Sequence, residues 1–169
     1  MKKTKRASSA RTAAKKFTCG YRCSEAILTT YCGKVGLNSD SAMKMGCALG
    51  GGLGSHGDIC GAITASILIL GLKHGRTDKT DSAKRIKTDS QVQKFLRKFK
   101  LMHKHIRCND LIGFDRSTPE GHDIAAAAGV FKNLCPKFVE DAASILEELL
   151  YTASTAQGGS CQIIEQRQD

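Results

Sequence analysis

The chain has 169 residues, a length that suits one domain with a core of its own. Apolar residues make up 41%, but aromatic residues are only 5%, there is no Trp and there are only two prolines, so we expect an all-α fold with an aliphatic core. No apolar run reaches the roughly 18 to 20 residues of a membrane span, and the basic N-terminus lacks the apolar segment of a secretory leader. We therefore expect a cytoplasmic protein without membrane contact.

The formal net charge of +10 is concentrated at the start of the chain, where residues 1–16 hold seven Lys or Arg and no acidic residue. We predict that this segment is a basic disordered tail. A helical domain at 17–151 and a flexible C-terminal tail at 152–169 follow it. A basic arm can bind nucleic acid through phosphates. Runs of charge are more often simply solvated, so a solvated tail is the favoured interpretation.

The remaining elements are expected as helices joined by polar loops. In chain order, helices are predicted from Cys23 to about Gly33, at 41–49, at 59–73, from Val92 to Ile106, at 124–131 and from Cys135 to Leu150, with a short turn at 108–113. Residues 76–90 and 114–122 are polar and are expected as loops.

The helix from Val92 has the clearest period, because apolar residues recur in it at spacings of three and four. They are Val92, Phe95, Leu96, Phe99, Met102 and Ile106. Its other face is basic, but no aromatic residue on that face could stack bases, so nucleic-acid binding is disfavoured.

A glycine-rich loop, Gly50 to Gly57, leads into Asp58, Cys60 and a long apolar run. We predict that Asp58 caps the following helix and that Cys60 lies in its first turn. There the free N–H groups and the helix dipole favour a negative charge, so Cys60 is expected to tend toward the thiolate. A phosphate-binding loop is disfavoured, because the G-K-[ST] ending is missing and no strand precedes it.

Eight cysteines are many for a protein that is not exported, and they favour metal or redox chemistry over disulfides. Four of them lie at or just before predicted helix starts: Cys23, Cys60, Cys108 and Cys135. Four thiolates converging from four helices would suit tetrahedral zinc or an iron–sulfur cluster. No C-x2-C pair occurs, and spacing alone leaves four ordinary buried thiols as an equal alternative.

Several motifs, taken in order, resemble the C_GCAxxG_C_C family over about Phe17 to Leu150. The matching pieces are Cys23-Ser24-Glu25-Ala26-Ile27-Leu28, Gly50-Gly51-Gly52-Leu53-Gly54, Cys60-Gly61-Ala62, Leu70-Gly71-Leu72-Lys73, Cys108-Asn109-Asp110-Leu111-Ile112-Gly113 and Cys135-Pro136-Lys137-Phe138-Val139-Glu140-Asp141-Ala142. The four cysteines of the family pattern fall on the four selected above. One position departs from the motif, because Ala65 stands where CGAxxG has its last glycine.

The resemblance implies a helical, redox-active protein in which these four cysteines bind an iron–sulfur cluster, either [2Fe-2S] or [4Fe-4S]. The family is similar to the cluster-bearing part of split-Soret cytochromes, which implies a homodimer. The chain has no C-x-x-C-H haem site, so haem binding does not carry over. For the glycines Gly51, Gly52, Gly54 and Gly61 we expect close backbone approach to the cofactor, with N–H groups bonded to its sulfurs.

Other residues have weaker connections to the site. Cys47 is a candidate for an extra ligand, and Cys19 for a neighbouring or resolving thiol. His56 could bind a metal or donate a hydrogen bond to a cluster, but a loop histidine that faces solvent is the favoured interpretation. Cys32 is expected in the core and Cys161 on the C-terminal tail.

Electron transfer through an iron–sulfur cluster is thus the leading functional hypothesis, with a redox partner protein that the sequence does not name. A structural zinc module is the main alternative. A metal-free thiol–disulfide protein with Cys60 as nucleophile is the third, disfavoured by the lack of C-x-x-C. No general acid/base pair or catalytic triad is recognisable, so no catalytic residue is assigned.

Overall fold

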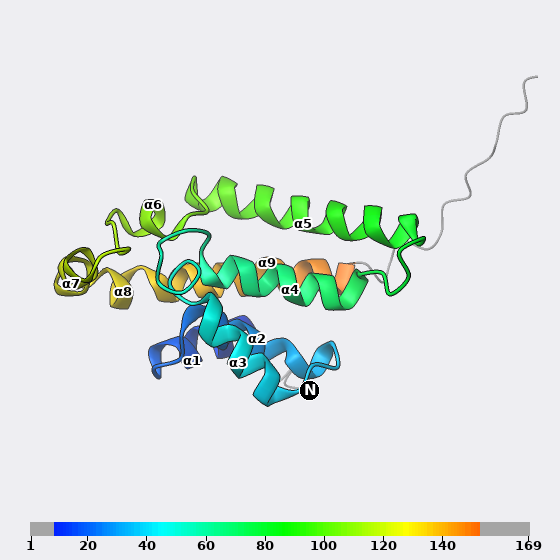
Figure 1. The fold of residues 1–169 in the computed structure, drawn as a ribbon, viewed down its shortest axis with the longest axis horizontal. Coiled ribbons are helices and arrows are strands. Elements are labelled where there is room, and N and C mark those ends of the chain that lie inside the picture. Colours follow the sequence, from blue (N-terminus) through cyan, green and yellow to red (C-terminus); the bar gives the residue numbers. More distant parts are fainter. Residues whose placement is uncertain (1–8, 153–169) are drawn as a thin grey trace, which may run out of the picture.

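A computed structural model describes residues 9–152, and every regular element within that range is a helix (Figure 1). The α-helices are α1 (Ser9–Thr18), α2 (Cys23–Tyr31), α3 (Ser39–Leu49), α4 (Gly61–His74), α5 (Ser82–His103), α6 (Cys108–Ile112), α7 (Pro119–Ala127), α8 (Val130–Asn133) and α9 (Cys135–Thr152), with a 3-10 turn, η1 (Cys32–Lys34). In the described range the only strand-like pairing is one isolated bridge, between Ile59 and Arg107. The expected all-α class is confirmed.

The helices form three layers, with α4 and α9 side by side in the middle (Figure 1). Helix α5 covers one side of this pair, and α1, α2 and α3 cover the other. Helix α4 packs against α2, α5 and α9, and its Ile63, Ile69 and Leu70 are fully buried. Each such side chain contributes roughly 1.5–3 kcal/mol by leaving water.

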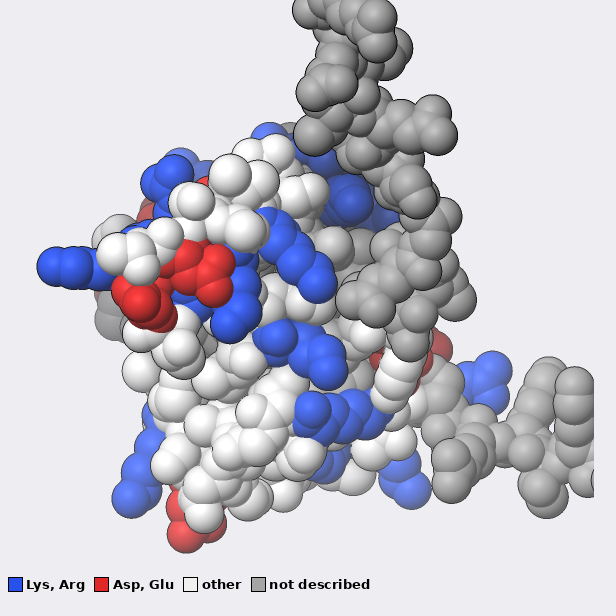
Figure 2. Space-filling model, turned by 90° about the vertical axis from the view of Figure 1, so that its right-hand side faces the viewer, with Lys and Arg blue, Asp and Glu red and all other residues white. Residues whose placement is uncertain are grey.

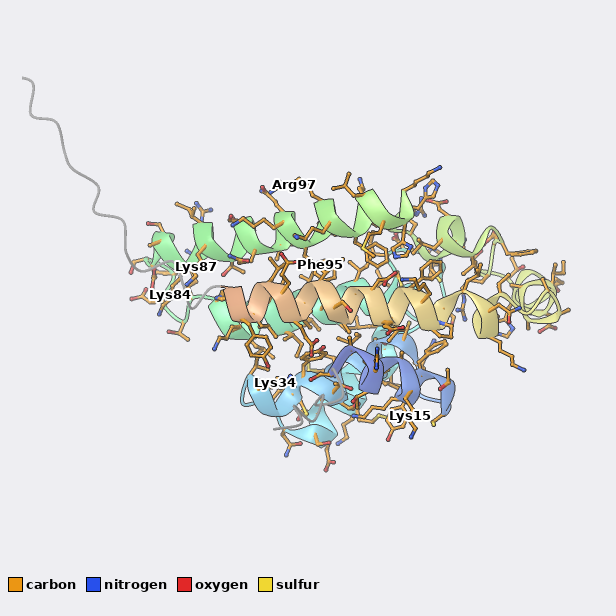
Figure 3. All side chains as sticks on the ribbon, turned by 180° about the vertical axis from the view of Figure 1, so that it is seen from behind. Lys15, Lys34, Lys84, Lys87, Phe95 and Arg97 are labelled. Atoms are coloured by element: carbon orange, nitrogen blue, oxygen red, sulfur yellow. The ribbon has the colours of Figure 1, made fainter. Side chains whose placement is uncertain are left out.

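Helix α5 has the two faces that its sequence period predicts. Phe95 and Phe99 are fully buried, and Phe95 points toward the α4–α9 layer while Arg97 points away from it (Figure 3). Met102 is the exception among the predicted core positions, with 53% of its surface exposed. In this last turn of α5 it is His103 that faces α9, where its ring packs on Phe138 and its Nε2 lies 3.0 Å from Asp141.

Helix α1 corrects the predicted tail boundary. Residues 9–16 were expected to be disordered, but they form most of this helix, which packs against α9. Ala10 and Ala13 are buried, and Phe17 packs on the same core. The spacing of these small and apolar residues places them on one face of a helix. A tail was predicted instead because the segment is rich in Lys and Arg. Residues 1–8 and 153–169, including Cys161, lie outside the described residues.

Three boundaries differ from the sequence predictions because of local capping. Helix α5 starts at Ser82 rather than after 90, since the Asp81 carboxylate accepts the Lys84 N–H at 2.9 Å. Helix α3 starts at Ser39 because the Asn38 side chain caps it. The predicted 124–131 helix is two helices, α7 and α8, separated by Gly129 at φ +72°.

Basic residues outnumber acidic ones on the end of the molecule where α4 ends and α5 begins (Figure 2). Among the described helices, none combines the length and the apolar composition that a membrane span needs.

Candidate functional site

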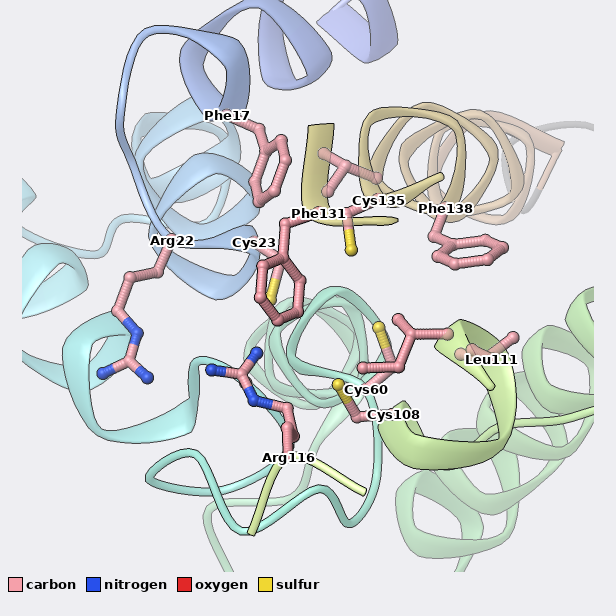
Figure 4. A pocket seen from close by; sticks show the side chains of 13 residues that line it. Phe17, Arg22, Cys23, Cys60, Cys108, Leu111, Arg116, Phe131, Cys135 and Phe138 are labelled. Atoms are coloured by element: carbon pink, nitrogen blue, oxygen red, sulfur yellow. The ribbon is translucent and has the colours of Figure 1, made fainter. Parts of the chain in front are cut away.

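Four helix starts bring four cysteines to one cavity. Cys23, Cys108 and Cys135 are the first residues of α2, α6 and α9, and Cys60 immediately precedes α4. All four line a cavity of about 180 Å³, and their sulfurs point into the same space (Figure 4). Residues separated by up to 112 positions in the sequence thereby become neighbours.

The rest of the cavity wall is mainly apolar. Aromatic and aliphatic side chains from α1, α6, α8 and α9 form it: Phe17, Leu111, Ile112, Phe131, Phe138 and Val139. The polar side chains of the wall are those of Arg22 and Arg116. Such a lining excludes water and strengthens every electrostatic interaction inside it.

Cys60 and Cys108 are held next to each other by a short extended pairing. The Cys60 N–H donates to the Ile106 carbonyl at 2.9 Å, and the Cys108 N–H donates to the Asp58 carbonyl at 2.7 Å. Together with the Ile59–Arg107 bridge, these bonds align the end of the glycine loop with the segment before α6. No local pattern in the sequence indicates this pairing, since its two sides are almost fifty residues apart.

The same pairing corrects the prediction that Asp58 caps α4. Helix α4 begins at Gly61, so Cys60 itself occupies the cap position, and its side chain accepts no capping hydrogen bond. The Asp58 carboxylate instead faces Arg107, with its oxygen 3.5 Å from Nε. Ile59 lies in the bridge between Asp58 and the helix, so α4 cannot begin at Asp58.

Three of the four predicted glycines contact the site. A Cβ at Gly61 would lie 2.7 Å from the Cys23 sulfur, one at Gly52 would lie 2.8 Å from Cys108 Cβ, and one at Gly51 would lie 2.7 Å from the Arg116 guanidinium carbon. Gly51 and Gly52 also have positive φ angles of +69° and +72°. Gly54 is exposed and does not line the cysteine cavity, although it lines an adjoining recess.

A shared hydrogen bond shifts the pKa values of Cys23 and Cys60 in opposite directions. The pKa of Cys23 is lowered to about 6, first because the Cys60 thiol donates a hydrogen bond to it, and also through the Gly51 and Ser24 N–H groups and the Arg116 charge. The pKa of Cys60 is raised well above its ordinary value, because its proton is held in that bond and the group is buried. These directions favour the thiolate on Cys23 rather than on Cys60, where the sequence predicted it.

Burial raises the pKa of the other two thiols. The pKa of Cys108 is raised, and that of Cys135 is raised to about 12, with Arg116 acting against the shift in both. In the metal-free site these shifts favour ionisation of Cys23 and oppose ionisation of the other three thiols. A metal must displace the remaining protons to bind all four sulfurs.

Two arginines are functional candidates that sequence reasoning missed. Arg116 reaches into the cavity from the loop after α6, and its guanidinium lies over the Phe131 ring, 4.9 Å from the centroid. Arg22 secures the glycine loop by donating to the Cys47 carbonyl at 2.9 Å, and to the Gly50 carbonyl and the Ser55 hydroxyl at 2.8 Å each. The only signal for Arg22 is its position next to Cys23, and Arg116 lies in a loop with no motif.

The other candidate residues stay outside the cavity. Cys19 and Cys47 are exposed, and Cys32 is half-buried and packs against the core. His56 is exposed in the glycine loop. Within residues 9–152, no group of three or more His, Cys, Asp or Glu side chains is close enough to hold a single metal ion.

The spacing of these cysteines corresponds to a known family. The profile of the family described as "Putative redox-active protein (C_GCAxxG_C_C)" matches residues 21–149. The chain belongs to this family. No curated protein and no solved structure matches significantly.

The C_GCAxxG_C_C pattern is thus a pattern of helix starts around one cavity. Ala65, which replaces the last glycine of the motif, is fully buried in α4. Its methyl group is accommodated in the core, in the second turn of α4.

Proposed function

We propose that Cys23, Cys60, Cys108 and Cys135 bind an iron–sulfur cluster and that the protein transfers electrons through it. The observation that carries the proposal is the convergence of four sulfurs from four helix starts on one apolar cavity. Four thiolate ligands are the usual complement of such a cluster, which supplies a reversible one-electron couple when bound.

The arrangement supports a cluster better than a single zinc ion. A structural zinc site needs its ligands close around one point, about 2.3 Å from the metal. The sulfurs instead surround a cavity of about 180 Å³, and no three metal-binding side chains in the described part of the chain form a single-ion site. A cluster of several iron and sulfide ions would fill the space between the four sulfurs, whereas a single zinc ion would not.

The charges around the cavity also suit an anionic guest. A cluster with four thiolates carries net negative charge, and a dry site must compensate that charge. Arg116 faces the cavity, and the N–H groups of Gly51 and Ser24 point toward Cys23. The starts of α2, α4 and α9 add positive potential.

A visible spectrum of protein purified without oxygen, together with iron, zinc and acid-labile sulfide assays, tests the proposal. We expect a brown protein with iron and sulfide that loses colour when any one of the four cysteines is replaced by serine. Cys19→Ser and Cys47→Ser are matched controls, since both thiols lie outside the cavity, and both variants should keep the colour.

Two other outcomes of these assays would contradict the iron–sulfur proposal. Colourless protein with one zinc would favour a structural metal module. Protein that stays metal-free after anaerobic reconstitution with iron and sulfide would overturn both metal proposals.

A thiol–disulfide function is the second candidate, and the Cys23–Cys60 pair favours it. The Cys23 thiolate would attack a substrate disulfide and release one thiol. The Cys60 thiol, after loss of its proton, would then attack the mixed disulfide, leaving a Cys23–Cys60 disulfide and a second thiol. Metal-free protein incubated with oxidised glutathione should then lose two thiols in this pair, as measured by mass spectrometry. Persistent glutathionylation of Cys23 would contradict it.

A further inference from the structure

A second hollow adjoins the cysteine cavity. It has a volume of about 280 Å³ and lies between the glycine loop and the start of α7. It is lined by one arginine, two histidines and three hydroxyl residues: Arg116, His56, His122, Ser55, Ser117 and Thr118. No acidic residue lines it. We call this hollow the basic recess.

Arg116 is common to the basic recess and the cysteine cavity. Its Nε is buried and has no hydrogen-bond partner, and within residues 9–152 no carboxylate lies in ion-pair distance of its guanidinium. Its acceptors are the Ser55 hydroxyl, at 3.4 Å, and the sulfur of Cys108. The absence of a carboxylate partner among the described residues leaves the guanidinium with unused donor capacity on the side of the recess, which an anionic ligand there would satisfy.

Two hydroxyl groups of the recess are set up as donors. The Ser55 oxygen already accepts hydrogen bonds from Arg22 and Arg116, and the Thr118 oxygen accepts the Gly121 N–H at 3.1 Å. The described part of the chain supplies no acceptor for either O–H, so both protons can be donated to a ligand. Ser117 differs, because its hydroxyl donates to Asp115 at 2.7 Å.

The carboxylates near the recess are already engaged. Asp115 accepts from the Asn109 amide at 2.8 Å as well as from Ser117, and Asp123 lies 3.3 Å from the ring nitrogen of His122. Neither carboxylate lines the recess. The recess therefore presents a guanidinium and hydroxyl donors, which are the groups that recognise oxyanions.

We propose that the basic recess binds a small oxyanion of phosphate or sulfate size, held by Arg116, Ser55 and Thr118. Phe131 separates the recess from the cysteines: it lines the cysteine cavity, and both Arg116 and His122 pack on its ring, at 4.9 Å and 5.3 Å. An oxyanion on Arg116 is thus one side chain away from the sulfurs. The binding of the oxyanion does not depend on the proposed function.

Isothermal titration calorimetry with inorganic sulfate and with inorganic phosphate, at constant ionic strength in chloride, tests the binding. We expect saturable 1:1 binding to the full chain. Arg116→Gln should weaken it by about tenfold or more, because a charge-assisted contact is lost. His56→Gln should also weaken it, and this exposed loop position carries little risk to folding.

Arg97→Gln is the matched control, since it removes the same charge from the exposed face of α5 and should leave the affinity unchanged. Equal loss in Arg97→Gln and Arg116→Gln would show a non-specific effect of charge and overturn the proposal. Absence of saturable binding at millimolar anion would also overturn it.

The titration is made on both coloured and colourless protein. Binding to protein that lacks a cluster would keep the oxyanion site while the electron-transfer proposal fails. A coloured protein that binds neither anion would retain the cluster proposal and overturn this one.

Discussion

Gly61 lies directly against the sulfur of Cys23, so that a Cβ at position 61 would be 2.7 Å from Sγ and 2.9 Å from the Leu49 carbonyl oxygen. The start of α4 thus passes the start of α2 at a distance that only glycine permits. Cys23 and Cys60 can share a hydrogen bond because nothing larger than hydrogen separates these helix starts.

We predict that Gly61→Ala destabilises the metal-free fold by about 1–3 kcal/mol, because the added methyl group overpacks a site bounded by backbone. Urea unfolding followed by circular dichroism measures the change. Gly71→Ala, in the same helix, is the control: a Cβ there meets nothing within 4 Å. That variant should gain about 0.5–1 kcal/mol from helix propensity. Equal effects of the two variants on the free energy of unfolding would mean that a methyl group fits between Gly61 and the Cys23 sulfur, and would contradict the close contact of α2 with α4.

The pH dependence of the metal-free protein should report the Cys23 thiolate. Its pKa is lowered from 9.0 to about 6, so ionised Cys23 stabilises the fold above pH 9, and this contribution is lost as the pH falls through about 6. The pKa of Cys135 is raised to about 12, so its effect has the opposite sign and lowers stability only above pH 9. Stability should therefore rise from pH 6 to pH 9.

Urea midpoints across this range provide the measurement. In Cys23→Ser the slope between pH 6 and pH 9 should become flatter, because the group responsible is gone. A slope that is unchanged in this variant would assign the effect to other groups and contradict the position of the thiolate.

The sequence was sufficient to predict the helix starts at the cysteines but not the contacts between them. Cys135-Pro136 begins α9 as expected, because proline at that position is compatible with a first turn. The Ile59–Arg107 bridge depends on tertiary contacts and has no local signature. For the same reason the directions of the two pKa shifts could not be predicted: both Cys23 and Cys60 are near helix starts, and the largest cause of each shift is the hydrogen bond between them.

Arg22 should hold the glycine loop in place. Its guanidinium donates to the Cys47 carbonyl, the Gly50 carbonyl and the Ser55 hydroxyl, so Arg22→Ala removes three hydrogen bonds from one segment. We expect a loss of about 1–3 kcal/mol. Amide hydrogen exchange should accelerate at residues 50–57 more than elsewhere, which mass spectrometry of peptic peptides can resolve.

Lys44→Ala is a control from the exposed face of α3, the helix that leads into the same loop. It should leave exchange in the loop unchanged. Uniform acceleration over the whole chain in Arg22→Ala would point to global destabilisation rather than to release of the loop.

Helix α1 should be part of the cooperative fold rather than an appendage. Ala13 is fully buried, where α1 packs against α9, so Ala13→Asp places a carboxylate in an apolar contact. We expect a loss of roughly 3 kcal/mol or more by urea unfolding. Thr12→Asp adds the same charge one position earlier, on the exposed side of the helix, and should change stability by less than about 0.5 kcal/mol. If the two variants were equally stable, residues 9–16 would behave as the solvated tail that their charge suggests. The difference between them therefore decides whether the alanine spacing or the basic composition governs this segment.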